Sequence, residues 1–242
     1  MRIVGVIPAR WASTRFKGKV LAKIQDRPMI QHVWERAKES RLLDEVLIAC
    51  DDERVLQAAQ AFGAKAVLTS PDHPSGTDRV AEAVKNCPAK IVINIQGDEP
   101  LIRHQVIDDL AEALIEDEAC LMATVIKAIE TQEELENPNV VKVVIDREKN
   151  AIYFSRLPIP YDREKAGTGT IRYYKHLGIY AYRKDFLMAL TQMPKSLLER
   201  AEQLEQLRAL EAGVRIKTIL TDMETIGVDT PEDLARVEGL LQ

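Results

Sequence analysis

Four cationic side chains lie close together near the start of the chain, directly after an aliphatic run. The run 3–7 leads into IPARWASTRFKGK, which carries Arg10, Arg15, Lys17 and Lys19. Arginine can bind two phosphate oxygens at once, and lysine supplies a compact positive charge. A loop that follows a parallel strand lies at the sheet edge where ligands bind in open α/β folds. The pattern predicts a phosphate-binding loop; the alternative is a solvated loop with incidental charge.

The same loop lacks the glycine spacing of the common nucleotide-binding motifs. It contains neither GxxxxGK[ST] nor GxGxxG. Side chains would therefore do much of the phosphate binding, and an ordinary NAD-dependent dehydrogenase is disfavoured.

Two aspartates are candidate metal ligands. Asp98 follows the aliphatic run of INIQGDEPLI, and Mg²⁺ typically takes one or two carboxylates together with substrate phosphates. A helix cap is the alternative for Asp98, and a surface charge is the favoured reading of its neighbour Glu99. Asp229 stands in GVDTPEDL, where Thr230 is also a natural helix N-cap. Taken alone, Asp229 is more often structural, but together with Asp98 it could complete a metal site, and the residues favour neither role.

A fourth segment, SPDHPSGTDRVAEAV, places Ser75, Gly76 and Arg79 at the start of an expected helix. Backbone N–H groups at a helix N-terminus can bind an anion or the edge of a base. Helix capping by Ser75 or Thr77 explains the segment about as well. His73 fits a turn better than a catalytic role.

The elements that must position these residues alternate along the first part of the chain, which predicts βαβ units and a mostly parallel sheet flanked by helices. The expected strands are 3–7, 46–49, 66–68 and 91–95, and the expected helices are 28–39, 52–61, 77–86 and 103–116. The second part is more mixed. It predicts strands at 121–129, 140–145, 151–154, 171–182 and 215–220, helices at 196–211 and 231–241, and an irregular loop at 158–169.

Composition narrows the class of protein. The chain has 242 residues, is 46% hydrophobic and carries a net charge of -5 without a basic stripe, which argues against a nucleic-acid partner. Its three cysteines are isolated and lack metal-ligand spacing, which is typical of reduced thiols in the cytoplasm. No segment is apolar for long enough to insert into a membrane. We expect a cytoplasmic protein with a single domain, 1–242.

Read in order, the segments resemble the CMP-Kdo synthetases, the 3-deoxy-manno-octulosonate (Kdo) cytidylyltransferases. The resemblance covers nearly the whole chain through IPARWASTRFKGK, PSGTDR, NIQGDEPLI, NPNVVKVV, YFSRLPIP, HLGIYAYR, LEQLRALEAG and GVDTPEDL. Trp11, Phe16 and Lys17 stand where tyrosine, leucine and proline are common in the family, and they flank the phosphate cations without replacing them.

The resemblance implies a nucleotide-diphospho-sugar transferase fold of the glycosyltransferase A type, usually a homodimer. Residues 1–120 would form the nucleotide-binding half and 121–242 the sugar-acid-binding and dimerisation half, and the fold would include a smaller mixed subregion for dimerisation and sugar binding. The implied reaction is Mg²⁺-dependent transfer of CMP from CTP to the anomeric hydroxyl of Kdo, which yields CMP-Kdo and pyrophosphate for lipopolysaccharide synthesis. CMP-sialic acid synthesis, another sugar nucleotidyltransferase activity, or a non-catalytic nucleotide sensor are the alternatives.

Site residues follow from the same resemblance. The nucleotide would be bound by Pro8, Ala9, Arg10, Arg15, Lys19, Ser75, Gly76 and Arg79. Catalysis would fall to Arg10, Arg15, Lys19 and the Mg²⁺ ligands Asp98 and Asp229. The Kdo pocket would comprise Gln96, Lys142, Arg156, His176, Tyr180, Glu205 and Gln206.

The residue types of the Kdo pocket are compatible with these roles but leave alternatives. Lys142 and Arg156 suit a carboxylate, or are solvated strand charges. His176 and Tyr180, four positions apart, share one face of a strand and can contact sugar hydroxyls, a half-polar sheet surface or a dimer partner. For residues 205 and 206, on an amphipathic helix, surface exposure is the default.

Overall fold

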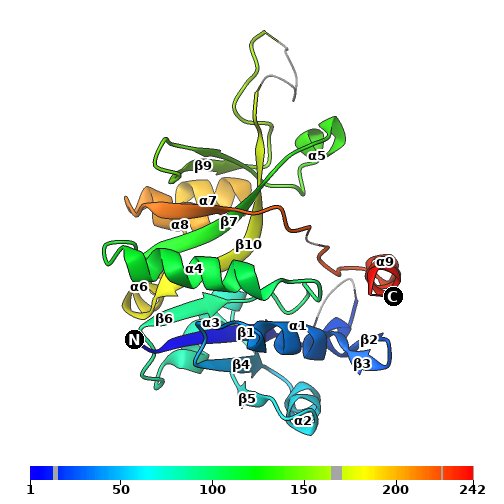
Figure 1. Cartoon of the computed structure of the whole chain (residues 1–242). Coiled ribbons are helices and arrows are strands. Elements are labelled where there is room, and N and C mark those ends of the chain that lie inside the picture. The colour runs from blue at the N-terminus through cyan, green and yellow to red at the C-terminus, as the bar shows by residue number, and fades with distance from the viewer. Residues whose placement is uncertain (13–15, 165–170, 225, 242) are drawn as a thin grey trace. The chain divides into compact units, whose positions relative to one another are not determined.

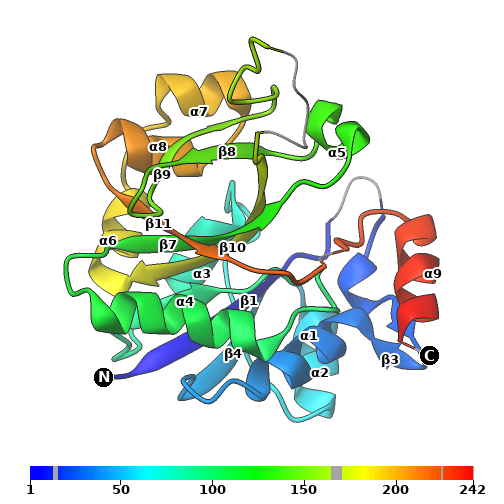
Figure 2. The same cartoon turned by 45° about the horizontal axis from the view of Figure 1, so that its top comes forward.

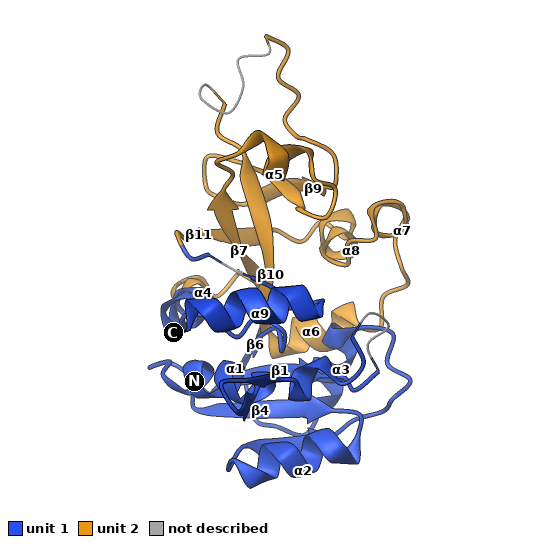
Figure 3. Ribbon diagram, turned by 90° about the vertical axis from the view of Figure 1, so that its right-hand side faces the viewer, with its two compact units in different colours: residues 1–112, 223–242 blue, residues 113–222 orange. Residues whose placement is uncertain are grey.

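The computed structural model describes residues 1–12, 16–164, 171–224 and 226–241. The chain forms two compact units, one made of 1–112 together with 223–242 and the other of 113–222 (Figure 3). The C-terminal segment therefore belongs to the first unit. Because Asp229 lies in this segment, it shares a unit with Arg10, Lys19 and Asp98.

The first unit contains a parallel sheet with the strand order β6 (Ile91–Asn94), β1 (Ile3–Ala9), β4 (Glu45–Cys50) and β5 (Lys65–Leu68). The central strand β1 is buried almost throughout, as expected for a parallel sheet covered on both faces. The predicted parallel arrangement is confirmed. Because neighbouring strands run the same way, the loops after β1, β4 and β6 leave the sheet at one edge.

Helices cover this sheet and begin at capping side chains. Both α1 (Met29–Lys38) and α3 (Gly76–Val84) pack against β1 and β4, while α2 (Glu53–Ala61) packs against β4 and β5 (Figure 1). Asp52 caps α2 and Ser75 caps α3, each by accepting a backbone N–H. The next helix, α4 (His104–Glu116), follows β6 and runs across the residue boundary between the two units. Among the described residues, no helix is both long and apolar enough to cross a bilayer.

The C-terminal segment packs against a small hairpin that the sequence did not predict. A 3-10 turn, η1 (Lys19–Leu21), leads into β2 (Lys23–Ile24) and β3 (Arg27–Pro28), and α9 (Pro231–Leu240) lies beside this hairpin (Figure 2). Ile24 and Met29 form an apolar cluster with Val228 and Val237. This cluster anchors the segment that carries Asp229 next to the segment that carries Lys19.

The second unit contains a mixed sheet. The strand β7 (Met122–Ala128) pairs in parallel with β11 (Ile216–Leu220) and antiparallel with β10 (Tyr174–Arg183). At the start of β10, β8 (Lys142–Ile145) pairs antiparallel with β10, and it also pairs antiparallel with β9 (Ala151–Ser155). Two short helices, α5 (Gln132–Glu136) and α6 (Lys184–Leu190), complete the unit together with the helices described next.

The prediction of one helix over 196–211 is wrong. The structure has α7 (Leu197–Glu202) and α8 (Gln206–Glu211), separated at Gln203, whose φ of 53° is left-handed. A buried ion pair holds the two helices together, because Arg208 donates to both carboxylate oxygens of Glu199 at 2.6 and 2.8 Å. The break turns the chain immediately before residues 205 and 206.

Candidate active site

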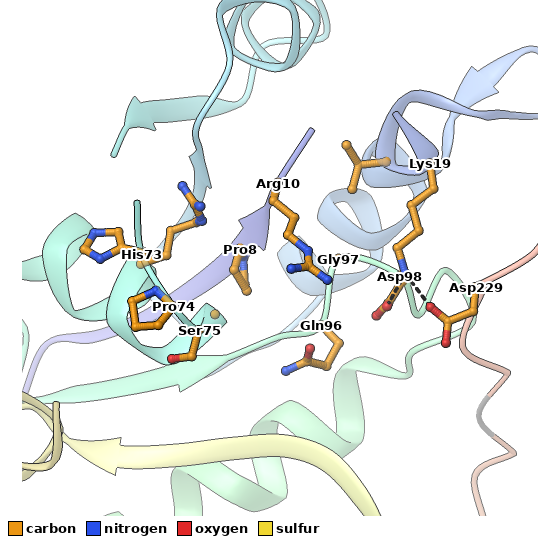
Figure 4. Close-up of a pocket in the computed structure, with 13 residues that line it drawn as sticks. Pro8, Arg10, Lys19, His73, Pro74, Ser75, Gln96, Gly97, Asp98 and Asp229 are labelled. Carbon is orange, nitrogen blue, oxygen red and sulfur yellow. Dashed lines mark hydrogen bonds and ion pairs between the residues drawn. The ribbon is translucent and has the colours of Figure 1, made fainter. Parts of the chain in front are cut away.

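A pocket of about 480 Å³ lies in the first unit, at the edge where β1, β6 and α3 meet (Figure 4). It is lined by Pro8, Arg10, Lys19, Val20, His73, Pro74, Ser75, Gly76, Arg79, Gln96, Gly97, Asp98 and Asp229. The lining is mostly polar at this edge, and the volume is within the range of small-molecule sites. Four separate sequence motifs therefore contribute to one cavity.

Lys19 joins the two candidate metal ligands. Its Nζ donates to Asp98 Oδ2 at 2.7 Å, to Asp229 Oδ1 at 2.9 Å and to the carbonyl of Val228 at 3.0 Å (Figure 4). Burial alone would lower the pKa of Lys19, but the two carboxylates outweigh it and hold that pKa above its ordinary value. The ammonium group is therefore charged at neutral pH. Because both carboxylates contact the same ammonium group, they are close enough together to bind the same metal ion.

Backbone contacts fix the position of both aspartates. The carbonyl of Asp98 accepts the N–H of Val228 at 2.9 Å, which ties the end of β6 to the C-terminal segment. Thr230 caps α9 in a capping box with Asp233, whose carboxylate also accepts the N–H of Asp229 at 3.0 Å. The cap predicted at Thr230 is confirmed, and it positions Asp229 rather than competing with it.

Gly97 allows β6 and β1 to approach closely beneath the pocket. A Cβ atom at this position would lie 2.7 Å from the carbonyl oxygen of Pro8. Because that neighbour is backbone, it cannot move aside as a flexible side chain could. A glycine is therefore required between Gln96 and Asp98.

The cationic loop is anchored through Trp11. Its N–H donates to Asp51 at 2.8 Å, and its carbonyl accepts the N–H of Gly18 at 3.0 Å. The guanidinium of Arg54 lies 3.8 Å from the indole centroid, and a Cβ on Gly18 would clash with the same ring at 2.7 Å. The two ends of the loop therefore close on Trp11. The predicted residue Arg15 lies outside the described residues.

Arg10 and Arg79 both line the pocket but differ in their surroundings. Arg10 is exposed and points into the cavity (Figure 4), and it makes no hydrogen bond to another described residue. Arg79 is buried and donates to Asp51 at 3.0 Å and to Thr69 at 2.6 Å. Arg10 can therefore bind a ligand directly, whereas Arg79 is largely committed to protein contacts.

Asp51 was missed by the sequence interpretation, although it positions two predicted residues. It accepts from the N–H that follows Arg10 and from the side chain of Arg79. The available signal was its place directly after a buried strand, at the sheet edge that carries the pocket.

The remaining nucleotide-site predictions divide into lining and supporting positions. Ser75 lines the pocket, accepts the N–H of Asp78 at 3.1 Å and donates to its carboxylate at 2.7 Å. Pro8 and Gly76 line the pocket side by side, while Ala9 is completely buried and is not a lining residue.

The expectation of a surface charge at Glu99 is wrong. Its Oε2 is buried without a hydrogen-bond partner among the described residues, and burial, with Asp98 nearby, raises its pKa to about 8.

In the second unit, Lys142 and Arg156 bind backbone carbonyls. The side chain of Lys142 is buried, and its Nζ donates to Asn137 O at 2.8 Å and Val140 O at 2.5 Å. Burial, with Arg156 nearby, lowers its pKa. The guanidinium of Arg156 donates to the carbonyls of Glu202 at 2.7 Å and of Pro138 at 3.0 Å. The two cations therefore connect the turn before β8 with the end of α7.

His176, Tyr180 and Gln206 form a polar cluster in the same unit. The rings of His176 and Tyr180 have centroids 5.3 Å apart, and the hydroxyl of Tyr180 donates to Gln206 Oε1 at 3.2 Å. Burial, with Glu205 nearby, raises the pKa of Tyr180, so the phenol remains a donor. Gln206 is 3% exposed, and its buried Nε2 has no hydrogen-bond partner among the described residues. The cluster thus contains an unused hydrogen-bond donor.

Comparison with known proteins agrees with this geometry. The family model for cytidylyltransferases matches residues 4–218. The 3-deoxy-manno-octulosonate cytidylyltransferase of Solibacter usitatus is 52% identical over 241 residues, covering 100% of this chain and 95% of the relative. The Geobacter sulfurreducens protein of the same name is 50% identical, covering 98% of each chain.

A solved structure gives the same picture. It is described as CMP:2-keto-3-deoxy-manno-octonic acid synthetase complexed with CTP, and it superimposes with a TM-score of 0.94 at 48% identity, covering 100% of this chain and 98% of the other. The chain therefore belongs to the 3-deoxy-manno-octulosonate cytidylyltransferase family, whose members are nucleotidyltransferases of α/β fold.

Proposed function

We propose that this enzyme transfers CMP from CTP to the anomeric hydroxyl of Kdo and releases pyrophosphate, and that the product serves lipopolysaccharide synthesis. The observation that carries the proposal is the convergence of Lys19, Asp98 and Asp229 on one pocket, in a chain about half identical to Kdo cytidylyltransferases along its full length. The predicted cytoplasmic location stays a prediction.

The phosphates of CTP have a direct partner in Arg10, which is exposed in the pocket. Arg15 is proposed for the same role on sequence grounds. The nucleoside would lie against Pro8, Ser75 and Gly76, where N–H groups of the first turn of α3 could bind an anion or the edge of a base. Arg79 and Ala9 would support this surface from behind.

Mg²⁺ fits the donor set that the pocket offers. Asp98 and Asp229 supply hard carboxylate oxygens that already converge on a single cation. The described residues contain no group of three or more histidine, cysteine or acidic side chains suited to a metal, so the other ligands would come from the substrates. Mg²⁺ bound there would lower the pKa of the attacking hydroxyl and neutralise phosphate charge.

The residues of the chain then account for an in-line displacement. The hydroxyl releases its proton to solvent as its oxygen bonds to the α-phosphorus, and the bond from that phosphorus to the oxygen that bridges it to the β-phosphate breaks as pyrophosphate leaves. Lys19 and Arg10 lie where they can stabilise the negative charge that develops on the leaving group. Asp51 holds the start of the cationic loop, so little reorganisation is needed during the reaction.

We propose that the six predicted residues of the second unit bind the sugar acid, namely Lys142, Arg156, His176, Tyr180, Glu205 and Gln206; the predicted residue Gln96 lines the pocket of the first unit. The buried Nε2 of Gln206, which has no hydrogen-bond partner among the described residues, supports this proposal. A buried donor without a partner costs free energy until a ligand binds it. Among the described residues, Lys142 uses two of its three N–H donors on carbonyls, and Arg156 uses three of its five, so each could still donate to a carboxylate.

Pyrophosphate release tests the function directly. With CTP and Mg²⁺, Kdo should support turnover at a kcat/KM at least about a hundredfold above that with sialic acid or a hexose 1-phosphate, the discrimination expected when buried polar groups are left unpaired. Faster turnover with sialic acid would assign the chain to CMP-sialic acid synthesis. CTP binding without turnover on any acceptor would favour the nucleotide sensor.

A further inference from the structure

Thr124 lies beneath an irregularity in the strand that carries His176 and Tyr180. Along β10, Leu177 pairs with Val125, and the next pair is Tyr180 with Thr124. Two residues of β10 therefore have no counterpart in β7, and the hydrogen-bond ladder is interrupted. The completely buried hydroxyl of Thr124 fills this interruption.

Three groups surround that hydroxyl. The carbonyl of Ile179 is 2.8 Å from Thr124 Oγ1, the carbonyl of Leu177 is 3.3 Å away, and Nε2 of His176 is 2.9 Å away. A hydroxyl has one proton to donate, and carbonyl oxygens can only accept. The proton of Thr124 therefore goes to a carbonyl, and the contact with His176 is an N–H group donating to the threonine oxygen.

These hydrogen bonds of Thr124 fix the tautomer of His176. Nε2 carries the proton, so in the neutral ring Nδ1 carries the lone pair. Burial lowers the pKa of His176 to about 3, which keeps the ring neutral at physiological pH. The structure gives the side chain of His176 no other hydrogen bond among the described residues, so Nδ1 is left to accept one.

We propose that Thr124 is a positioning residue that holds His176 in the Nε2–H tautomer, so that Nδ1 accepts a hydrogen bond from a hydroxyl group of the acceptor sugar. The inference rests on the proposed function, which places His176 in the sugar site. Together with the free donor of Gln206, it gives that site one acceptor and one donor. A hydroxylated ligand would be favoured over one that presents only acceptors.

Nuclear magnetic resonance of the ligand-free enzyme tests the tautomer without any assay of activity. In protein labelled with ¹⁵N at histidine, the spectrum contains four rings, and His176→Gln identifies the signal of interest. Wild type and Thr124→Ser should show the Nε2–H pattern, whereas Thr124→Val should shift the population toward Nδ1–H. A wild-type ring protonated at Nδ1 overturns the inference, and this result requires only that His176→Gln folds so that the signal can be assigned.

Kinetics test the consequence. Thr124→Val should raise the KM for Kdo about tenfold and leave the KM for CTP within twofold, and Thr124→Ser should restore the wild-type value. Equal losses toward both substrates would reveal a merely structural role and overturn the proposal. If wild type shows the expected tautomer but does not transfer CMP to Kdo, the proposed function has failed instead.

Discussion

Lys19 connects three segments that are far apart in the sequence. Its ammonium group contacts the end of β6 through Asp98 and the C-terminal segment through Asp229 and the Val228 carbonyl. The residue types were enough to predict a cation and two carboxylates with phosphate and metal chemistry. Their direct contact was not predictable, because it depends on the packing of α9 against a hairpin that has no clear sequence signature.

Asp98→Asn should abolish nearly all turnover while CTP binding stays within severalfold of wild type. The amide keeps the size of the side chain but removes the charge that would hold Mg²⁺ and that pairs with Lys19. Steady-state kinetics and calorimetric titration with CTP measure the two effects. Glu112→Gln, an exposed carboxylate, is the control. More than about a tenth of wild-type kcat at saturating Mg²⁺ would contradict the metal role.

His176 should make the stability of the protein depend on pH. Its pKa is about 3 in the folded state against an ordinary value of 6.5. As pH falls below 6.5, the unfolded chain gains a proton that the folded protein does not, so stability present above that pH is progressively lost. Denaturant unfolding should show that the stability of wild type, relative to His176→Gln, falls by about 2 kcal/mol between pH 7 and pH 5. A difference that does not change with pH would contradict the low pKa.

At the scale of elements, the pocket is built from the loops that follow β1, β4 and β6. Parallel pairing places Ala9 opposite Cys50, so the residues that follow each strand leave at the same edge. Asp51 after β4 then supports the loop after β1, and Gly97 after β6 allows the backbone of Pro8 to approach. The function of the site thus depends on the spacing of three strand ends.

Gly97→Ala should damage this arrangement. The added Cβ would lie 2.7 Å from Pro8 O, so the end of β6 would have to move and carry Asp98 with it. We expect a loss of about 1–3 kcal/mol in the free energy of unfolding, as for overpacking, together with a reduced kcat. Chemical denaturation and kinetics would measure both.

Gly239→Ala is the matched control for that variant. Gly239 lies within α9, and a Cβ there would meet nothing within 4 Å. Alanine should stabilise the helix by about 0.5–1 kcal/mol. Equal effects of the two substitutions would show that the close approach at Gly97 does not matter.

The regular elements of the first unit were predictable because their signals are local. Aliphatic runs marked the strands, and Ser75 and Thr230 marked helix starts that the structure confirms. The break at Gln203 had no such signal, because neither glycine nor proline marks it and the leucines keep helical spacing on both sides. The interruption in β10 did have a signal, because it includes Gly178 and a glycine inside a strand often marks a bulge, but the sequence analysis did not use it.

At the scale of the whole molecule, the candidate sites are distributed over two units. The pocket with Asp98 and Asp229 is formed entirely by the first unit, because the C-terminal segment returns to it. The cluster of His176, Tyr180 and Gln206 belongs to the second. Motif order along the chain indicated which residues act together, but only the structure places Asp229 in the first unit.

The second unit also has exposed apolar side chains that bear on dimer formation. Ile152 on β9 is 59% exposed, and Leu157 and Tyr161 in the following segment are 71% and 81% exposed. Exposed apolar side chains are typical of interaction surfaces where they gather in one patch. They support the homodimer that the family resemblance implies, and we propose that this surface forms its interface.

Leu157→Asp combined with Tyr161→Asp should therefore convert a dimer into a monomer. Each buried apolar side chain contributes about 1.5–3 kcal/mol to association, so losing two should raise the dimer Kd at least about a hundredfold. Sedimentation velocity across a concentration series measures this directly. The control is Leu240→Asp, which charges a side chain that is 61% exposed in the first unit and should leave the dimer intact. A wild-type chain that sediments as a monomer, or a double variant that remains dimeric, would place the exposed apolar residues of the second unit outside any interface between copies.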